Sequence, residues 1–157
     1  MSNRREDVCY ECSYTPNYHS FHLLNETEDQ YYFYSCPSET QKYNDPDGFI
    51  KHVKLEIDDI NKQWTWIFNA EFFGLKHVRC KTLHTQLMYL LADYSDISLK
   101  NIIIINQNMT FKTYLRACWY YIPEHLRKKI IFDVKNNFSS LLNIDNSLDN
   151  LHYDLLN

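Results

Sequence analysis

The sequence predicts an α/β fold in three layers, with a mostly parallel central sheet of about five strands and helices on both faces. Three short apolar runs, at residues 64–68, 102–105 and 130–132, have the composition of buried β-strands. Segments with helical periodicity separate these runs. Such alternation is typical of βαβ units, in which helices cover a parallel sheet.

The N-terminal part is predicted to supply the edge of the sheet and the first covering helix. Residues 18–24 and 31–36 form a candidate hairpin around the acidic turn 25–29. Asp45 and Pro46 have the residue types of an N-cap and a first helical position. The helix that they begin carries one apolar stripe, formed by Phe49, Val53, Ile57 and Ile60.

The next segments predict the centre of the sheet. A strand at 63–69 is followed by a turn around Gly74 and a helix over 76–94. The strand at 101–106 contains four consecutive isoleucines. Because it does not alternate between apolar and polar residues, we expect it to be covered on both faces and to lie inside the sheet.

The C-terminal part begins with another amphipathic helix, which ends at Pro123. A basic turn at 124–129 and a strand at 130–134 follow. The rest of the chain is predicted to form one or two short amphipathic helices. Their apolar positions are Phe138, Leu141, Leu142, Leu148, Leu151 and Leu155.

Length and composition indicate one globular domain over residues 1–157, with residues 1–14 as a polar arm. No linker divides the chain, and the N-terminal residues contain no apolar stretch of the kind that signal peptides have, so we expect none here. The five cysteines are odd in number and do not have the spacing of a disulfide scaffold, so we expect a reducing, cytoplasmic location.

Charge and glycine content exclude several function classes. The net charge of −4 provides no general attraction to nucleic acid, and we expect no nucleic-acid partner. The chain has only two glycines, Gly48 and Gly74, so the glycine-rich motifs of dinucleotide-binding folds, P-loops and nucleophile elbows cannot occur. His77, Cys80 and His84 share a helix face, but no catalytic triad can be assembled, and we expect no enzymatic activity.

Three segments resemble CRAL-TRIO domains. Residues 66–77 resemble the strand and turn of that family, residues 103–106 with the following helix resemble its Asn-ended strand and gate helix, and residues 122–132 resemble the segment after the gate. Several positions depart from the family pattern. Asn69 stands where the family usually has Asp, and Phe72 stands where Gly is common. Gln107 and Asn108 stand where the family usually has Ala-Pro. The family's preceding helical module and its terminal signature are not expected here.

The resemblance implies a non-enzymatic protein that holds a lipid, or another hydrophobic small molecule, in a cavity between sheet and gate helix, and exchanges it during transient contact with a membrane surface. The lipid-binding residues that it implies are Phe111, Leu115, Trp119, Ile122, Phe68, Ile103 and Ile105. The basic residues Lys112, Arg127, Lys128 and Lys129 would meet lipid phosphates or an anionic membrane, or simply be solvated. The alternative is a protein-interaction scaffold of the same fold, with a filled core, a protein partner and no ligand.

One further pattern concerns metal. Cys9, Cys12, His19 and His22 are spaced C-x2-C-x6-H-x2-H, and their thiolates and imidazoles suit tetrahedral zinc. However, a three-residue offset within a strand directs His19 and His22 to opposite faces. We therefore expect no cofactor and no metal site from the sequence, and a zinc-dependent binding module remains the third interpretation.

Overall fold

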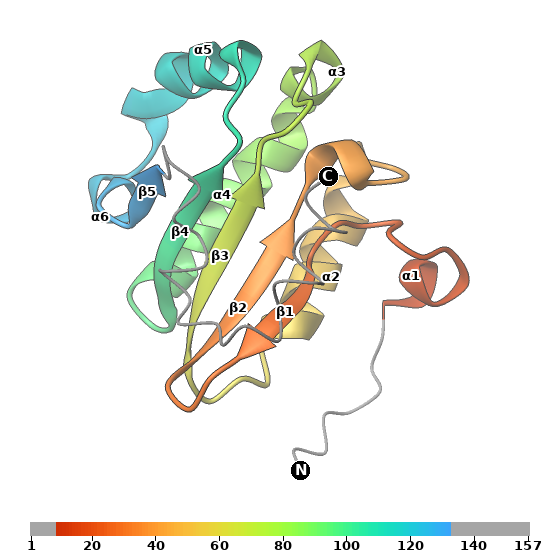
Figure 1. The fold of residues 1–157 in the computed structure, drawn as a ribbon, viewed down its shortest axis with the longest axis vertical. Helices are drawn as coiled ribbons and strands as arrows, with labels where there is room; N and C mark the ends of the chain where they lie inside the picture. The colour runs from red at the N-terminus through yellow and green to blue at the C-terminus, as the bar shows by residue number, and fades with distance from the viewer. Residues whose placement is uncertain (1–8, 133–157) are drawn as a thin grey trace.

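The computed structural model of this chain describes residues 9–132, and Figure 1 shows their arrangement. One five-stranded sheet forms the framework, and its strands lie in the order β1-β2-β3-β4-β5. The strands are β1 (His22–Glu26), β2 (Gln30–Ser35), β3 (Gln63–Asn69), β4 (Leu99–Ile105) and β5 (Ile130–Phe132). β1 pairs antiparallel with β2, and all other neighbours are parallel. The predicted hairpin, the mostly parallel sheet and the α/β class are confirmed.

Helices and short helical turns connect the strands. They are α1 (Tyr10–Tyr14), η1 (Pro37–Glu39), α2 (Pro46–Ile57), α3 (Leu75–Val78), α4 (Lys81–Ser95), α5 (Met109–Cys118), η2 (Trp119–Tyr121) and α6 (Glu124–Arg127). None of the helices within residues 9–132 has the length and apolar character needed to cross a bilayer.

β3 and β4 lie inside the sheet, as their apolar sequences predict. Trp66 pairs with Ile102, and Ile67 pairs with Ile103, in parallel register. All four isoleucines of β4 are buried. Neighbouring strands pair with the backbone N–H and C=O groups on both sides of β3 and β4. The side chains on both faces of these strands are removed from water.

The main hydrophobic cluster lies between the sheet and the helices. α2 and α4 run behind the sheet in Figure 1, and both contribute to this cluster. We call this side of the sheet the helix face. Its buried members include Phe33, Val53, Ile57, Trp64, Trp66, Leu83, Leu90 and Ile104. Phe21 stacks on Phe33 with 5.0 Å between ring centroids, which ties the segment before β1 to the same core.

The opposite side of the sheet, which we call the open face, carries a second apolar cluster. It consists of Tyr32, Tyr34, Cys36, Ile67, Ile103 and Ile105. Within residues 9–132, no helix contributes an apolar side chain to this cluster. The strand order explains why. Because spatial order follows chain order from β2 to β5, successive right-handed crossovers place their helices on the same face.

The structure differs from the expected elements in three places. The helix expected over 76–94 is divided into α3 and α4, because Cys80 leaves the helical region with φ −82° and ψ 55°. The first strand begins at His22 rather than at residue 18. The segment expected as a polar arm contains α1, and Cys9 next to it is buried. The helices expected at Phe138–Leu155 and the end of the strand expected at 130–134 lie outside the described residues.

Candidate functional site

The carboxyl ends of β3 and β4 are joined by one side chain. Asn108 donates from its Nδ2 to the carbonyl of Phe73 at 2.9 Å, and its Oδ1 accepts from the backbone N–H of Phe111 at 2.9 Å. The second bond caps α5, and the first holds the turn that follows β3. Asn108, one of the departures from the family pattern, therefore couples the start of α5 to this turn.

Asn69, at the end of β3, is buried and forms a second set of polar contacts. Its Nδ2 donates to the hydroxyl of Tyr34 at 2.9 Å, and its Oδ1 accepts from the backbone N–H of Glu71 and from the Nδ2 of Asn106. Burial raises the pKa of Tyr34, so that its hydroxyl stays neutral. The amide found in place of the family's Asp thus provides the donor that a buried tyrosine oxygen can accept.

α5, the helix that the sequence resemblance indicates as the gate, packs tightly on the helix face. The ring of Phe111 lies 5.4 Å from that of Phe68 and 5.2 Å from that of Phe73. Leu115 and Ile122 are partly buried against the same cluster. Four of the predicted lipid-binding residues, Phe68, Phe111, Leu115 and Ile122, therefore belong to one packed region.

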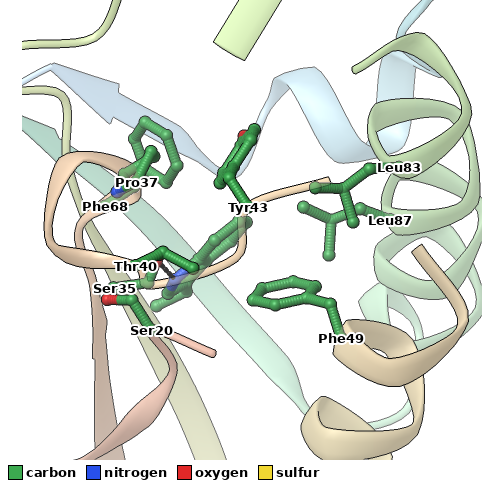
Figure 2. A pocket seen from close by; sticks show the side chains of 10 residues that line it. Ser20, Ser35, Pro37, Thr40, Tyr43, Phe49, Phe68, Leu83 and Leu87 are labelled. Atoms are coloured by element: carbon green, nitrogen blue, oxygen red, sulfur yellow. Dashed lines mark hydrogen bonds between the residues drawn. The ribbon is translucent and has the colours of Figure 1, made fainter. Parts of the chain in front are cut away.

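The cavity in this region is small. Figure 2 shows a pocket between α2, α4 and the sheet, lined by residues that include Tyr43, Phe49, Phe68, Leu83 and Leu87. Its volume is about 10 Å³. A space of that size holds roughly one water molecule. An acyl chain does not fit in this pocket without moving the side chains that line it.

The remaining predicted lipid-binding residues lie elsewhere. Ile103 and Ile105 belong to the open face, because the register pairs Ile103 with Ile67 rather than with Phe68. Trp119 lies in η2, where its ring centroid is 6.2 Å from that of Phe132. The structure therefore does not bring the seven predicted residues together. Four of them lie on the helix face, Ile103 and Ile105 lie on the open face, and Trp119 lies in η2 beside Phe132.

The open face contains residues that the sequence interpretation missed. Tyr34, Ile67, Ile103 and Ile131 are paired across four neighbouring strands and form one continuous row. Tyr32 and Ile105 extend this row along the strands. Alternation within β3 would have selected Ile67 instead of Phe68, but only with the register known.

The basic turn is largely engaged with the protein itself. Lys128 pairs with Glu124 at 2.9 Å, and the Nζ of Lys129 donates to the carbonyls of Leu99, at 2.6 Å, and Ser95. The guanidinium of Arg127 lies 6.0 Å from the ring centroid of Trp119. Lys129 therefore helps to anchor this turn to the sheet, while Lys112 is exposed on α5.

The histidines near Cys80 form a structural network. His84 is hydrogen-bonded through Nε2 to the hydroxyl of Tyr43 at 2.9 Å and through Nδ1 to that of Tyr114 at 2.5 Å. Burial, followed by the proximity of His77, lowers the pKa of His84 to about 4. Burial also raises the pKa of the Cys80 thiol, which disfavours the thiolate. This arrangement shows no activated nucleophile.

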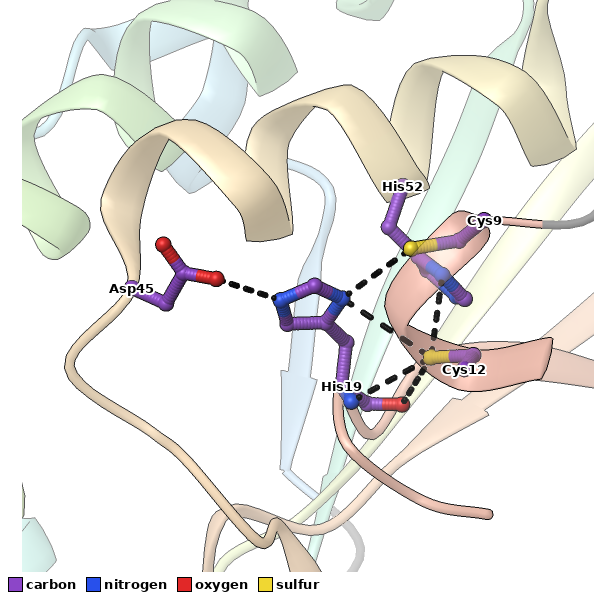
Figure 3. A network of polar contacts seen from close by, with 5 residues as sticks. All are labelled: Cys9, Cys12, His19, Asp45 and His52. Carbon is purple, nitrogen blue, oxygen red and sulfur yellow. Dashed lines mark hydrogen bonds and ion pairs between the residues drawn. The ribbon is translucent and has the colours of Figure 1, made fainter. Parts of the chain in front are cut away.

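Three of the four residues in the predicted C-x2-C-x6-H-x2-H pattern lie close together. Cys9, Cys12 and His19 converge, and the fourth member of their group is His52 from α2 (Figure 3). His22 points elsewhere, with its ring 5.4 Å from that of Tyr34. No local spacing signals His52, which lies far from the other three in the sequence.

Comparison with known proteins supports the resemblance noted in the sequence. The sequence model of the CRAL/TRIO domain matches residues 48–150, which is more than half of the chain. The matched region extends from α2 through β3, β4, α5 and β5. A search of curated proteins found no match.

Proposed function

Because the chain belongs to the CRAL/TRIO domain family, we propose that it binds a lipid or another hydrophobic small molecule against the open face of its sheet. One observation carries this proposal. An apolar row crosses four strands on a face to which no helix within residues 9–132 contributes an apolar side chain. Tyr34, Ile67 and Ile103 are buried, whereas Ile131, at the β5 end of the row, is 37% exposed, so a hydrophobic ligand would extend this apolar surface from Ile131.

The packing of the helix face supports the same choice. Its cavity has room for about one water molecule, and its aromatic rings are already in contact. Opening it would break these contacts, at a cost typical of disrupting a packed core. The open face involves no such disruption of α2 and α4, so we place the ligand there.

Exposed apolar side chains suggest how a ligand is exchanged. Phe72, Leu75 and Met109 are each more than two-thirds exposed, near the carboxyl ends of β3 and β4. We call these three residues the apolar tip. Phe72 has a φ of 54°, a conformation that a bulky residue rarely adopts. Lys76 and Lys112 are exposed on the adjoining helices, so the tip is suited to an anionic lipid surface.

The proposed activity involves no covalent chemistry. CRAL/TRIO domains are generally ligand-binding and transfer domains, and the buried histidines and cysteine near His84 are not activated. The protein would shield its ligand from water and release it when the apolar tip meets a membrane.

A specific observation also favours the scaffold alternative. The pocket between α2, α4 and the sheet has room for about one water molecule, as expected for a member of the family that no longer carries a ligand. In that case the open face would contact a protein partner instead of a lipid. The two proposals differ in whether purified protein carries a small hydrophobic molecule.

Native mass spectrometry of the full chain, purified without detergent, tests the proposal. We expect a species heavier than the polypeptide by the mass of one lipid, and organic extraction should release that lipid. Binding of a fluorescent fatty-acyl probe to delipidated protein provides a second measurement. Protein that carries no lipid and does not bind the probe would exclude ligand binding and favour the scaffold.

A further inference from the structure

Two cysteines and two histidines converge where the N-terminal segment meets α2. The thiols of Cys9 and Cys12 and one imidazole nitrogen each of His19 and His52 all lie within 4.8 Å of one another. Cys9, His19 and His52 are buried, and Cys12 is partly buried. Figure 3 shows the four side chains facing a common centre. No role in ligand binding explains this cluster, which lies among α1, α2 and the segment before β1.

The distances match those of a tetrahedral metal site. Zn–S bonds of about 2.3 Å and Zn–N bonds of about 2.05 Å at tetrahedral angles separate sulfur from nitrogen by about 3.6 Å. Here the Nδ1 of His19 lies 3.5 Å from the Sγ of Cys9 and 3.8 Å from the Sγ of Cys12. The Nδ1 of His52 lies 3.6 Å from the Sγ of Cys12. All three separations agree with sulfur and nitrogen atoms that share one ion.

The outer nitrogens of both histidines have partners of the kind that metal-binding histidines use. The Nε2 of His19 lies 2.9 Å from the Oδ2 of Asp45, and the Nε2 of His52 lies 2.5 Å from the carbonyl oxygen of Phe21. A carboxylate or carbonyl at Nε2 fixes the proton on that nitrogen and leaves the lone pair of Nδ1 directed to the centre. The backbone N–H of His19 also points to the Sγ of Cys12, at 3.4 Å.

The position of Asp45 supports a role in orienting His19 for metal binding. It occupies the N-cap position of α2, yet its side chain makes no capping hydrogen bond. A capping aspartate commonly stabilises a protein by roughly 1 kcal/mol through such a bond. Here the carboxylate instead orients His19.

We propose that Cys9, Cys12, His19 and His52 bind one zinc ion with tetrahedral geometry. Two thiolates and two imidazoles are a ligand set that selects zinc among the common divalent metals. The four protein ligands leave no open position for water or substrate, so the ion has a structural role. The site includes His52 in place of His22, the residue that the local sequence spacing indicates.

The position of the site explains what the ion would do. α1 is five residues long and has no buried residue. So short a helix is unstable in isolation, because few backbone bonds offset the cost of nucleation. Ligands on both sides of α1, at Cys9 and His19, and a fourth on α2 would fix this segment to the domain. The zinc ion thus replaces a hydrophobic core for the N-terminal segment.

A disulfide between Cys9 and Cys12 is the competing chemistry, since C-x2-C pairs also occur in redox proteins. Both thiols are free in this structure. A disulfide would consume the two sulfur ligands and would leave His19 and His52 without the ion that their Nδ1 atoms face. Intact mass under non-reducing conditions, with and without thiol alkylation, separates the two states.

The test uses the full chain, purified without chelator and dialysed extensively, with zinc measured by elemental mass spectrometry. We expect close to one zinc per chain in the wild type. Cys12→Ser and His52→Ala should lose it. His22→Ala and Cys118→Ser, which change a histidine and a cysteine outside the cluster, should retain it. A zinc signal that survives in His52→Ala and disappears in His22→Ala would overturn the proposed ligand set.

Cobalt substitution keeps the proposal testable if His52→Ala does not fold. Co²⁺ added to metal-free wild type should give visible absorption bands of a tetrahedral ion and a near-ultraviolet thiolate charge-transfer band. His52→Cys supplies a third thiolate, so its charge-transfer band should be stronger than in the wild type. Absence of zinc together with absence of a tetrahedral cobalt spectrum, or a Cys9–Cys12 disulfide in the freshly purified chain, would refute the site.

Discussion

Gly48 leaves the space that the carboxylate of Asp45 occupies. A Cβ atom placed on Gly48 would lie 2.2 Å from the Oδ2 of Asp45 and 2.8 Å from its Cγ. The same Oδ2 atom lies 2.9 Å from the Nε2 of His19. Glycine inside a helix costs about 1 kcal/mol relative to alanine. The first turn of α2 thus carries a residue of low helix propensity where the carboxylate partner of His19 needs room.

This relationship predicts that Gly48→Ala weakens zinc binding, although alanine favours the helix. The new methyl group displaces Asp45 and removes the partner that orients His19. Asp45→Asn should have a similar effect, because an amide is a weaker acceptor. Loss of such a partner lowers metal affinity by about 10–100-fold. Competition with a chromophoric chelator measures the change. Asp47→Asn, an exposed charge change in the same turn, should leave zinc affinity unaltered.

Metal removal should lower thermal stability. Zinc that binds only the folded chain stabilises it by about 2.7 kcal/mol at 100 times its Kd. For a domain of this size, that corresponds to a rise in Tm of roughly 5–10 °C. Thermal scans at increasing zinc concentrations should show Tm rising in the wild type and remaining constant in Cys12→Ser. A wild-type Tm that is insensitive to both zinc and chelator would contradict a structural ion.

The two faces of β4 should respond differently to the same substitution. Ile103 is on the open face and Ile104 on the helix face, and both are buried isoleucines in one strand. Each Ile→Ala change should destabilise the chain by about 2–5 kcal/mol. Only Ile103→Ala should also reduce binding of a fatty-acyl probe, measured at a temperature where both variants are folded. Equal loss of binding in the two variants would remove the assignment of the ligand to the open face.

α5 should behave as part of the packed core. Leu115 contacts the filled helix-face cluster, so Leu115→Trp should incur an overpacking penalty of about 1–3 kcal/mol. Chemical denaturation measures this penalty. Acyl-probe binding should be maintained, because the added ring does not enter the open face. A stable Leu115→Trp variant with reduced probe binding would instead locate the ligand under α5, between Phe68 and Phe111.

His84 should make the chain less stable in acid. The pKa of His84 is about 4 in the folded state, below the usual histidine value of 6.5, so the unfolded chain binds the proton more readily between these values. Stability from neutral His84 is therefore present above pH 6.5 and is lost as the pH falls towards 4. The slope contributed by one such group is at most about 1.4 kcal/mol per pH unit, and partial exposure of His84 reduces it.

The His84→Gln variant separates the contribution of His84 to the pH dependence of stability from that of the other histidines. His84→Gln cannot be protonated in this range but can still hydrogen-bond to the hydroxyls of Tyr43 and Tyr114. Its free energy of unfolding, measured by denaturant titration, should fall less steeply than that of wild type between pH 6.5 and 4.5. Parallel pH profiles for the two proteins would show that His84 does not titrate differently in the folded and unfolded chains.

The sequence by itself determined the fold class and the positions of the main strands. The non-alternating isoleucines of β4 and the aromatic run of β3 predicted interior parallel strands, because only strands covered on both faces tolerate such composition. Asp45 and Pro46 correctly marked the start of α2. The family resemblance followed from the same segments, and the match over residues 48–150 confirmed it.

Only the tertiary structure decided which side chains meet. The strand register pairs Ile103 with Ile67 and Phe68 with Ile104, so Phe68 and Ile103 lie on opposite faces of the sheet. A shift of one residue would have moved Ile103 to the same face as Phe68. Packing of α2 beside the N-terminal segment selected His52 as the fourth member of the cysteine–histidine cluster and left His22 on β1. Local periodicity determines elements, but contacts between residues far apart in the chain depend on how those elements pack. The ligand face and the zinc site proposed here both arise from such long-range contacts.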